Sequence, residues 1–188
     1  MATAALVALG ALGISAQGPR NAPIERFTAA SPVMTSAARL TLQPVEIVIT
    51  QWSTGTAHRA LATALIEQGP LAFERLLCNY ESAGFISVAG LPEVVVRYAW
   101  SFNEPNGDRR IYLATDTPVA LASAQPQRFP AEESLTFVEL RVNQDGDGVA
   151  KLSDAAHLFV DSLNVIEIGD YNRRPVHLLM VRSERPVE

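Results

Sequence analysis

The chain has 188 residues, of which 48% are hydrophobic and 19% are charged, and its formal net charge is −5. This length and composition are typical of one soluble globular domain with its own core. Because the 15 lysines and arginines are scattered instead of forming a basic stripe, neither nucleic acid nor an anionic membrane surface is an expected partner.

The N-terminal segment predicts export. Residues 5–14 are apolar, and this run is too short to span a bilayer. It ends in small residues that resemble a cleavage site, so we expect residues 1–16 to be a signal peptide and residues 17–25 a tether. No lysine or arginine precedes the run, which leaves a plain disordered end as the alternative. The signal predicts a periplasmic or secreted protein without a membrane span after its removal.

The chain begins its folded part with strands. Residues 27–33 are expected to form a short first strand, and residues 35–43 are expected to form a loop. The segment 45–52 alternates cleanly between its two faces, which predicts a half-buried strand.

A helical pair interrupts this pattern. Apolar residues recur at helical spacing, which predicts helices near 55–68 and 70–80. Gly69 and Pro70 separate the two helices, because proline suits a first helical turn. We expect the pair to cover one face of a sheet.

After Gly84 apolar residues again recur at every second position, which is typical of strands. The clearest strand places five side chains on one face: Val94, Val96, Tyr98, Trp100 and Phe102. Further strands are expected at 85–90, 109–116, 135–142, 149–160, 163–168 and 176–182. Residues 117–133 contain three prolines and predict a long connection that serves as a lid, a binding loop or an irregular edge.

Consecutive strands joined by short turns must be antiparallel, because parallel neighbours need long crossovers. The pattern therefore predicts an α+β, β-dominated domain over residues 26–184. We expect an antiparallel meander of about eight or nine strands, forming a strongly curved sheet or barrel, with one inserted helical pair.

The stretch NQDGDGVAKLSD, residues 143–154, has oxygen-bearing side chains at the spacing of a calcium loop. A calcium loop needs flanking helices, however, and the neighbouring segments alternate as strands. Asp-Gly pairs are also preferred in tight hairpin turns, where a positive φ is required. The favoured interpretation is a hairpin, with weak calcium binding as the alternative.

No other motif predicts catalysis, a metal or a cofactor. The three histidines, His58, His157 and His177, are dispersed and do not show the spacing of a helical metal site. The chain has no nucleophile elbow and no glycine-rich phosphate loop after a strand. We therefore expect no catalytic residue, no metal ligand and no cofactor.

Four side chains are candidate ligand-binding residues. Tyr98 and Trp100 would be stacking platforms at a barrel mouth, although a place in the core is the favoured alternative. Arg97 and Arg109, with the adjacent Arg110, lie on neighbouring predicted strands and could meet an anionic ligand. Pairing of these arginines with acidic residues across the sheet is the commoner arrangement.

The chain resembles a family of exported bacterial proteins at several motifs. These are the Trp-Ser-Thr at 52–54, Arg97-Tyr98, the RRIYLATDTP segment at 109–118 and the PVHL segment at 175–178. The resemblance extends from about residue 27 to residue 182 and implies export and a single unit of fold. It implies no activity. An aromatic residue that the family pattern predicts after Val119 is missing here.

These observations predict a non-enzymatic exported domain that binds a small apolar ligand or an envelope protein. One alternative is an enzyme of unfamiliar type, in which His157 or His177 acts with a nearby carboxylate at the bottom of a cleft. The other is a structural or assembly module that docks a partner through an open sheet edge or through residues 117–133.

Overall fold

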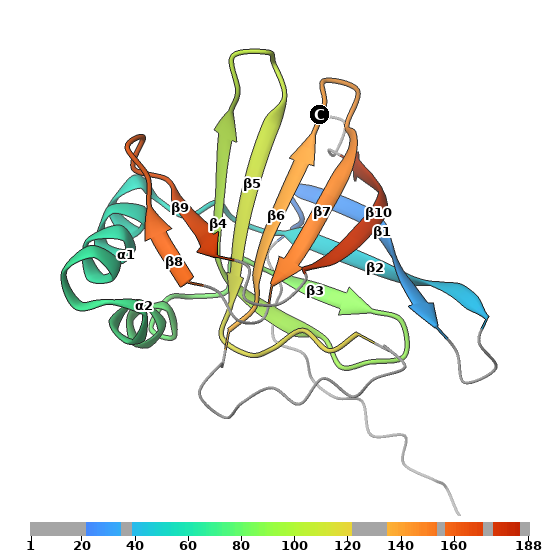
Figure 1. The fold of residues 1–188 in the computed structure, drawn as a ribbon, viewed down its shortest axis with the longest axis horizontal. Coiled ribbons are helices and arrows are strands. Elements are labelled where there is room, and N and C mark those ends of the chain that lie inside the picture. The colour runs from blue at the N-terminus through green and yellow to red at the C-terminus, as the bar shows by residue number, and fades with distance from the viewer. Residues whose placement is uncertain (1–21, 35–38, 122–134, 154–156, 171–174, 185–188) are drawn as a thin grey trace, which may run out of the picture.

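The computed structural model describes residues 22–34, 39–121, 135–153, 157–170 and 175–184. Its main body is a closed eight-stranded barrel, with two helices and a two-stranded hairpin together on one flank (Figure 1). The prediction of an antiparallel, barrel-like fold with one helical pair is confirmed. The expected signal peptide and most of the expected 117–133 loop lie outside the described residues.

The strands in the described part of the chain are β1 (Glu25–Met34), β2 (Leu40–Ile49), β3 (Gly84–Val88), β4 (Val94–Asn103), β5 (Arg109–Thr115), β6 (Phe137–Val142), β7 (Asp147–Ser153), β8 (His157–Val160), β9 (Ile166–Asp170) and β10 (Val176–Glu184). The helices are α1 (Gly55–Gln68) and α2 (Pro70–Leu77). Thr54 caps α1 by accepting a hydrogen bond from the Ala57 N–H. Gly69 ends α1 with a φ of 82°, a conformation that glycine adopts at little cost.

The barrel is a meander closed by its last strand. Its strand order is β1-β10-β7-β6-β5-β4-β3-β2, and all neighbours are antiparallel. The hairpin of β8 and β9 leaves the barrel after β7, and β10 then returns to pair with both β7 and β1. Closure removes exposed edges along the paired lengths of these strands.

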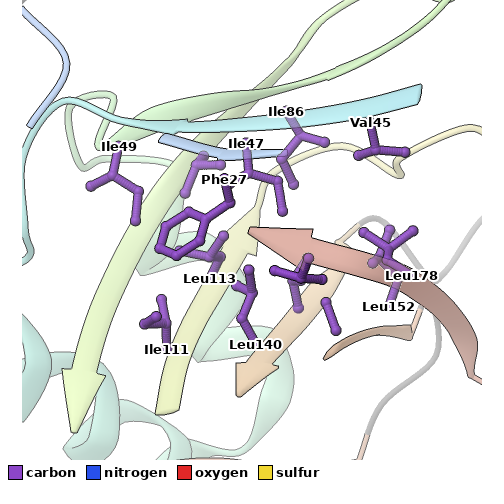
Figure 2. Packing of buried hydrophobic residues seen from close by; sticks show 14 of the residues in the cluster. Phe27, Val45, Ile47, Ile49, Ile86, Ile111, Leu113, Leu140, Leu152 and Leu178 are labelled. Carbon is purple, nitrogen blue, oxygen red and sulfur yellow. The ribbon is translucent and has the colours of Figure 1, made fainter. Parts of the chain in front are cut away.

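The interior of the barrel is filled by side chains, which we call the interior core. Aliphatic residues from all eight strands meet there with Phe27 (Figure 2). Its fully buried members include Phe27, Ile47, Ile49, Ile86, Ile111, Leu113 and Leu140. Burying each such side chain contributes roughly 1.5–3 kcal/mol, so this core is a main source of stability.

A second core lies outside the barrel, and we call it the flank core. The outer faces of β4, β5 and β6 pack there against α1, α2 and the β8–β9 hairpin. Its buried members are Leu61, Ala62, Leu65, Phe73, Leu77, Tyr98, Tyr112, Ala114, Phe137, Leu158, Val165 and Ile166. The helices therefore cover one face of the sheet, as the sequence predicts.

The structure corrects the prediction that Val96 and Tyr98 share a face of β4. Val96 pairs with Thr115 and Tyr98 pairs with Ala114, so Arg97 is an extra residue in a β-bulge. The bulge reverses the alternation, because Val96 lies in the interior core and Tyr98 lies in the flank core.

Several predicted element boundaries also differ from the structure, for example the end of the second helix at Leu77 instead of residue 80, and two of the differences are instructive. Strand β2 begins at Leu40, inside the expected 35–43 loop, because its first residues pair with the end of β1 despite their mixed polarity. The expected strand 149–160 is divided between β7 and β8, which belong to different sheets. The spacing of apolar residues predicts a strand on both sides of this division, but it does not indicate which sheet the strand joins.

Residues 143–146 form the turn of the predicted hairpin between β6 and β7. The Asn143 N–H donates to the Asp147 carbonyl at 2.9 Å, and Gly146 has a φ of 85°. The Asn143 side chain also accepts from the Asp147 N–H at 2.9 Å, so its oxygen stabilises the turn. Neither described helix is long and apolar enough to cross a membrane.

Candidate functional site

The structure places the four predicted ligand-binding residues in three separate regions. Tyr98 and Trp100 face the flank core, Arg97 lies in the bulge of β4, and Arg109 lies inside one end of the barrel. Of the two predicted features, Tyr98 and Trp100 stay together, whereas Arg97 and Arg109 line different hollows.

Tyr98 and Trp100 contact His58 of α1. The imidazole ring stacks on Trp100 with ring centroids 4.2 Å apart and an interplanar angle of 8°. Tyr98 is fully buried, and its hydroxyl lies 2.8 Å from His58 Nδ1. Tyr98 is therefore part of a core, which was the favoured alternative to a stacking platform. The sequence did not indicate His58 as its partner, because no local pattern links two residues so far apart.

The partners of His58 determine its protonation. Its Nε2 lies 2.6 Å from the carbonyl oxygen of Asn164, and a carbonyl can only accept, so Nε2 carries a proton. In the neutral ring Nδ1 then accepts from the Tyr98 hydroxyl. Burial lowers the pKa of His58, and the nearby Arg59 charge lowers it further, against the opposing effect of the Asn164 hydrogen bond. His58 thus joins α1, β4 and the β8–β9 turn as a neutral ring.

Arg97 lines a hollow of about 320 Å³ on the side of the barrel, which we call the flank pocket. Its lining residues are Gln51, Trp52, Ser53, Thr54, Ala57, Tyr80, Glu81, Ala83 and Arg97. Trp52 and Tyr80 provide its aromatic surface, and most of its exposed lining area is apolar. The pocket therefore combines an apolar surface with one guanidinium group.

The Arg97 side chain is held in place by two partners. Its Nε donates to the Asp116 carboxylate at 2.7 Å, and its Nη1 donates to the Tyr80 carbonyl at 3.1 Å. The predicted cross-strand pairing with an acidic residue is thereby found for Arg97. Nη2 has no protein acceptor among the described residues. Arg97 thus retains N–H donors for another molecule.

Two contacts fix the segment that carries Trp52. The Ser53 N–H donates to the Ala99 carbonyl at 2.8 Å, and the Ser53 hydroxyl accepts from the Ala99 N–H at 3.0 Å. The next residue, Thr54, caps α1, so the first turn of that helix borders the pocket. The N–H groups of a first helical turn add positive potential.

Arg109 lies in a different hollow, of about 400 Å³, at the end of the barrel; we call it the barrel-end hollow. It is lined by Asn103, Gly107, Arg109, Val142, Asn143, Gln144, Asp145, Gly146 and Ser183. The Arg109 guanidinium pairs with Glu25 through both terminal nitrogens, at 3.0 Å for Nη1. Glu25 is only 3% exposed, so this ion pair is buried rather than on the surface.

Arg110 belongs to the outer face and has several partners of its own. It forms ion pairs with Glu104 and Glu167, and its Nη1 lies 3.5 Å from the Tyr112 hydroxyl. Hydrogen bonding to Tyr112 and pairing with Glu104 raise the pKa of Arg110, which keeps it charged. Arg110 is therefore a structural link between β5 and β9.

The described residues contain no group of three or more His, Cys, Asp or Glu side chains placed to bind a metal ion. The ring nitrogens of His58 contact a hydroxyl and the backbone and side chain of Asn164, with no carboxylate among these partners. His177 is exposed on β10. The side chain of His157, which the enzyme alternative would use, lies outside the described part of the chain.

Comparisons of the chain with protein-family models, with curated proteins and with solved structures found no match. The resemblance to a family of exported bacterial proteins therefore stays a prediction.

Proposed function

We propose that this protein is a non-enzymatic binding domain that holds a small, mainly apolar molecule in the flank pocket. The observation that carries this proposal is the joint placement of Trp52, Tyr80 and Arg97 around one hollow of about 320 Å³. Ligand pockets are typically apolar and aromatic, with a few polar groups that orient the ligand.

The flank pocket is a better candidate than the barrel interior. Small barrels can hold one ligand inside, but only when side chains leave room for it. Here the interior core occupies the space between the strands (Figure 2). Its members Phe27, Ile111 and Leu140 are 0% exposed. The pocket instead lies where the segments around Trp52 and Tyr80 cover β4.

The polar groups of the pocket favour a ligand with a neutral oxygen acceptor. Arg97 is already paired with Asp116, and Glu81 adds a further negative charge to the lining. An anionic ligand would therefore gain little net attraction, whereas a carbonyl oxygen could accept from the remaining N–H groups of Arg97. An apolar molecule that carries one carbonyl group fits these features. An exported location, supported by the apolar N-terminal run, is part of this proposal.

Fluorescent dyes provide a direct test. The chain has two tryptophans, so Trp100→Phe leaves Trp52 as the only indole donor for energy transfer. We expect Prodan, a naphthyl ketone, to bind this variant with saturable energy transfer from Trp52. Removing the aromatic wall with Trp52→Ala, measured by dye emission in otherwise wild-type protein, should weaken binding about tenfold.

Arg97→Lys tests the role of the guanidinium, because lysine keeps a positive charge opposite Asp116. We expect it to weaken Prodan about fivefold and to leave phenylnaphthylamine, which lacks an oxygen acceptor, nearly unchanged. Phe159→Ala, at an exposed position on β8, is a control that should not affect either dye. Equal binding of Prodan by the wild-type protein and Trp52→Ala would exclude the flank pocket as its site.

A further inference from the structure

The end of the barrel carries a polar layer that belongs neither to the interior core nor to the flank pocket. Glu25, Arg109 and Ser183 each stand two residues from a buried member of the interior core, namely Phe27, Ile111 and Val181. Because strand side chains alternate, these three polar residues face the barrel interior, one layer outward from the apolar residues. We call these three residues, Glu25, Arg109 and Ser183, the polar floor, and they lie beneath the hairpin turns at this end of the barrel.

This floor is held rigidly by hydrogen bonds. Arg109 Nη1 donates to Glu25 Oε2 at 3.0 Å, and Arg109 Nη2 pairs with Glu25 Oε1. The Ser183 hydroxyl donates to the same Oε1 at 2.6 Å. Three strands, β1, β5 and β10, therefore fix the plane of the guanidinium group before any ligand arrives.

One donor of this floor has no protein acceptor. The Arg109 Nε atom is buried and makes no hydrogen bond with the described residues. A buried N–H without an acceptor is unfavourable, and such groups in folded proteins usually bond to a ligand, an ion or water. Since Arg109 lines the barrel-end hollow, an oxygen atom within that hollow is the natural acceptor.

The other groups around the hollow both donate and accept hydrogen bonds. The Asn103 carboxamide and the Asp145 carboxylate line it, and neither makes a side-chain hydrogen bond in the described part of the chain. The charge of Arg109 is balanced by Glu25, and Asp145 adds a negative charge, so the hollow does not favour an anion. A hydroxyl group, which donates and accepts at once, satisfies all three side chains.

We propose that the barrel-end hollow is a second binding site, for a small neutral hydroxylated molecule such as a monosaccharide or cyclic polyol. One hydroxyl oxygen accepts from Arg109 Nε–H, and neighbouring hydroxyls bond to Asn103 and Asp145. This site is independent of the flank pocket, because the two hollows share no lining residue.

Nuclear magnetic resonance of the whole protein tests this site. The Arg109 Nε–H cross-peak, assigned by its loss in Arg109→Lys, is followed while D-glucose or myo-inositol is added, and separately with inorganic phosphate. We expect a saturable shift with at least one polyol and none with phosphate. Asn103→Ala should weaken the response about fivefold, whereas Asn79→Ala, at an exposed position after α2, should not change it.

Three results would overturn the proposal: no saturable shift of the cross-peak with either polyol, a stronger response to phosphate, or equal responses in Asn103→Ala and wild type. Trp52→Ala should leave the polyol response intact. The polyol titration therefore tests the barrel-end hollow alone, and the dye measurements test the flank pocket alone.

Discussion

The interior core and the flank core differ in chemistry as well as in place. The interior core is mostly aliphatic and is closed on all sides by backbone-paired strands. The flank core contains two buried tyrosines, Tyr98 and Tyr112, and borders His58, all of which carry polar atoms that need partners. Both cores exclude water, but only the flank core contains buried tyrosine hydroxyl groups that need hydrogen-bond partners.

This difference indicates how the two regions should respond to substitutions that remove packing. Loss of packing inside the barrel affects every strand, because the sheet is one continuous closed ring. The helices and the β8–β9 hairpin are instead joined to one side of that ring through side chains. We expect the flank to open locally at a lower free energy than the barrel.

Removing one phenylalanine from each core gives the largest expected effect. Phe27 and Phe73 are both 0% exposed, so the two substitutions are matched in size and burial. Phe27→Ala should lower the free energy of unfolding by about 3–5 kcal/mol, measured by urea denaturation. Phe73→Ala should chiefly speed amide hydrogen exchange in α1, α2 and the β8–β9 hairpin. If exchange in the barrel strands accelerates equally, the two cores are one cooperative unit.

Removing a hydroxyl tests the polar part of the flank core. Tyr98→Phe leaves His58 Nδ1 without its donor in a buried place, which should cost about 1–3 kcal/mol of unfolding free energy. Tyr112→Phe is the matched control, because its partner Glu167 is 26% exposed at the side chain and can bond to water instead. A Tyr112→Phe cost equal to or above that of Tyr98→Phe would contradict this account.

The smallest expected effect is a pH dependence of the flank. The pKa of His58 is lowered in the folded protein from its ordinary 6.5, so the unfolded chain takes up the proton more readily. The stability from the neutral ring is complete above pH 6.5 and is lost as the pH falls below that value. Unfolding free energies at about pH 7.5 and about pH 5 should differ more in the wild type than in His58→Gln. Equal differences would show that His58 does not contribute.

The alternation of the strands was sufficient to predict an antiparallel, strongly curved sheet or barrel, but not its closure or its details. Period two after Gly84 and the short turns gave antiparallel pairing, and the Asp-Gly pairs gave the hairpin at 143–148. The bulge at Arg97 was missed because a single extra residue leaves the local pattern intact while it exchanges the faces. Its position is determined by pairing with β5, which is a long-range contact.

The sites were less predictable than the fold. Arg97 and Arg109 were identified as candidates from their residue type and strand, yet they lie in separate hollows. Trp52 and Tyr80 were not associated with Arg97, because their segments meet only after the helices pack against β4. The pairing of Arg109 with Glu25 joins strands that lie far apart in the chain, and no sequence pattern indicates such a partner.

The pairing of β1 with β10 has a consequence for how the chain acquires its shape. Arg26 pairs with Glu184, so the ring is completed between the two strands most distant in sequence. Until β10 has formed, β1 lacks the partner strand on one of its two sides. Long-range pairing of this kind slows folding. Until it forms, unpaired apolar strands stay exposed and can associate with other chains.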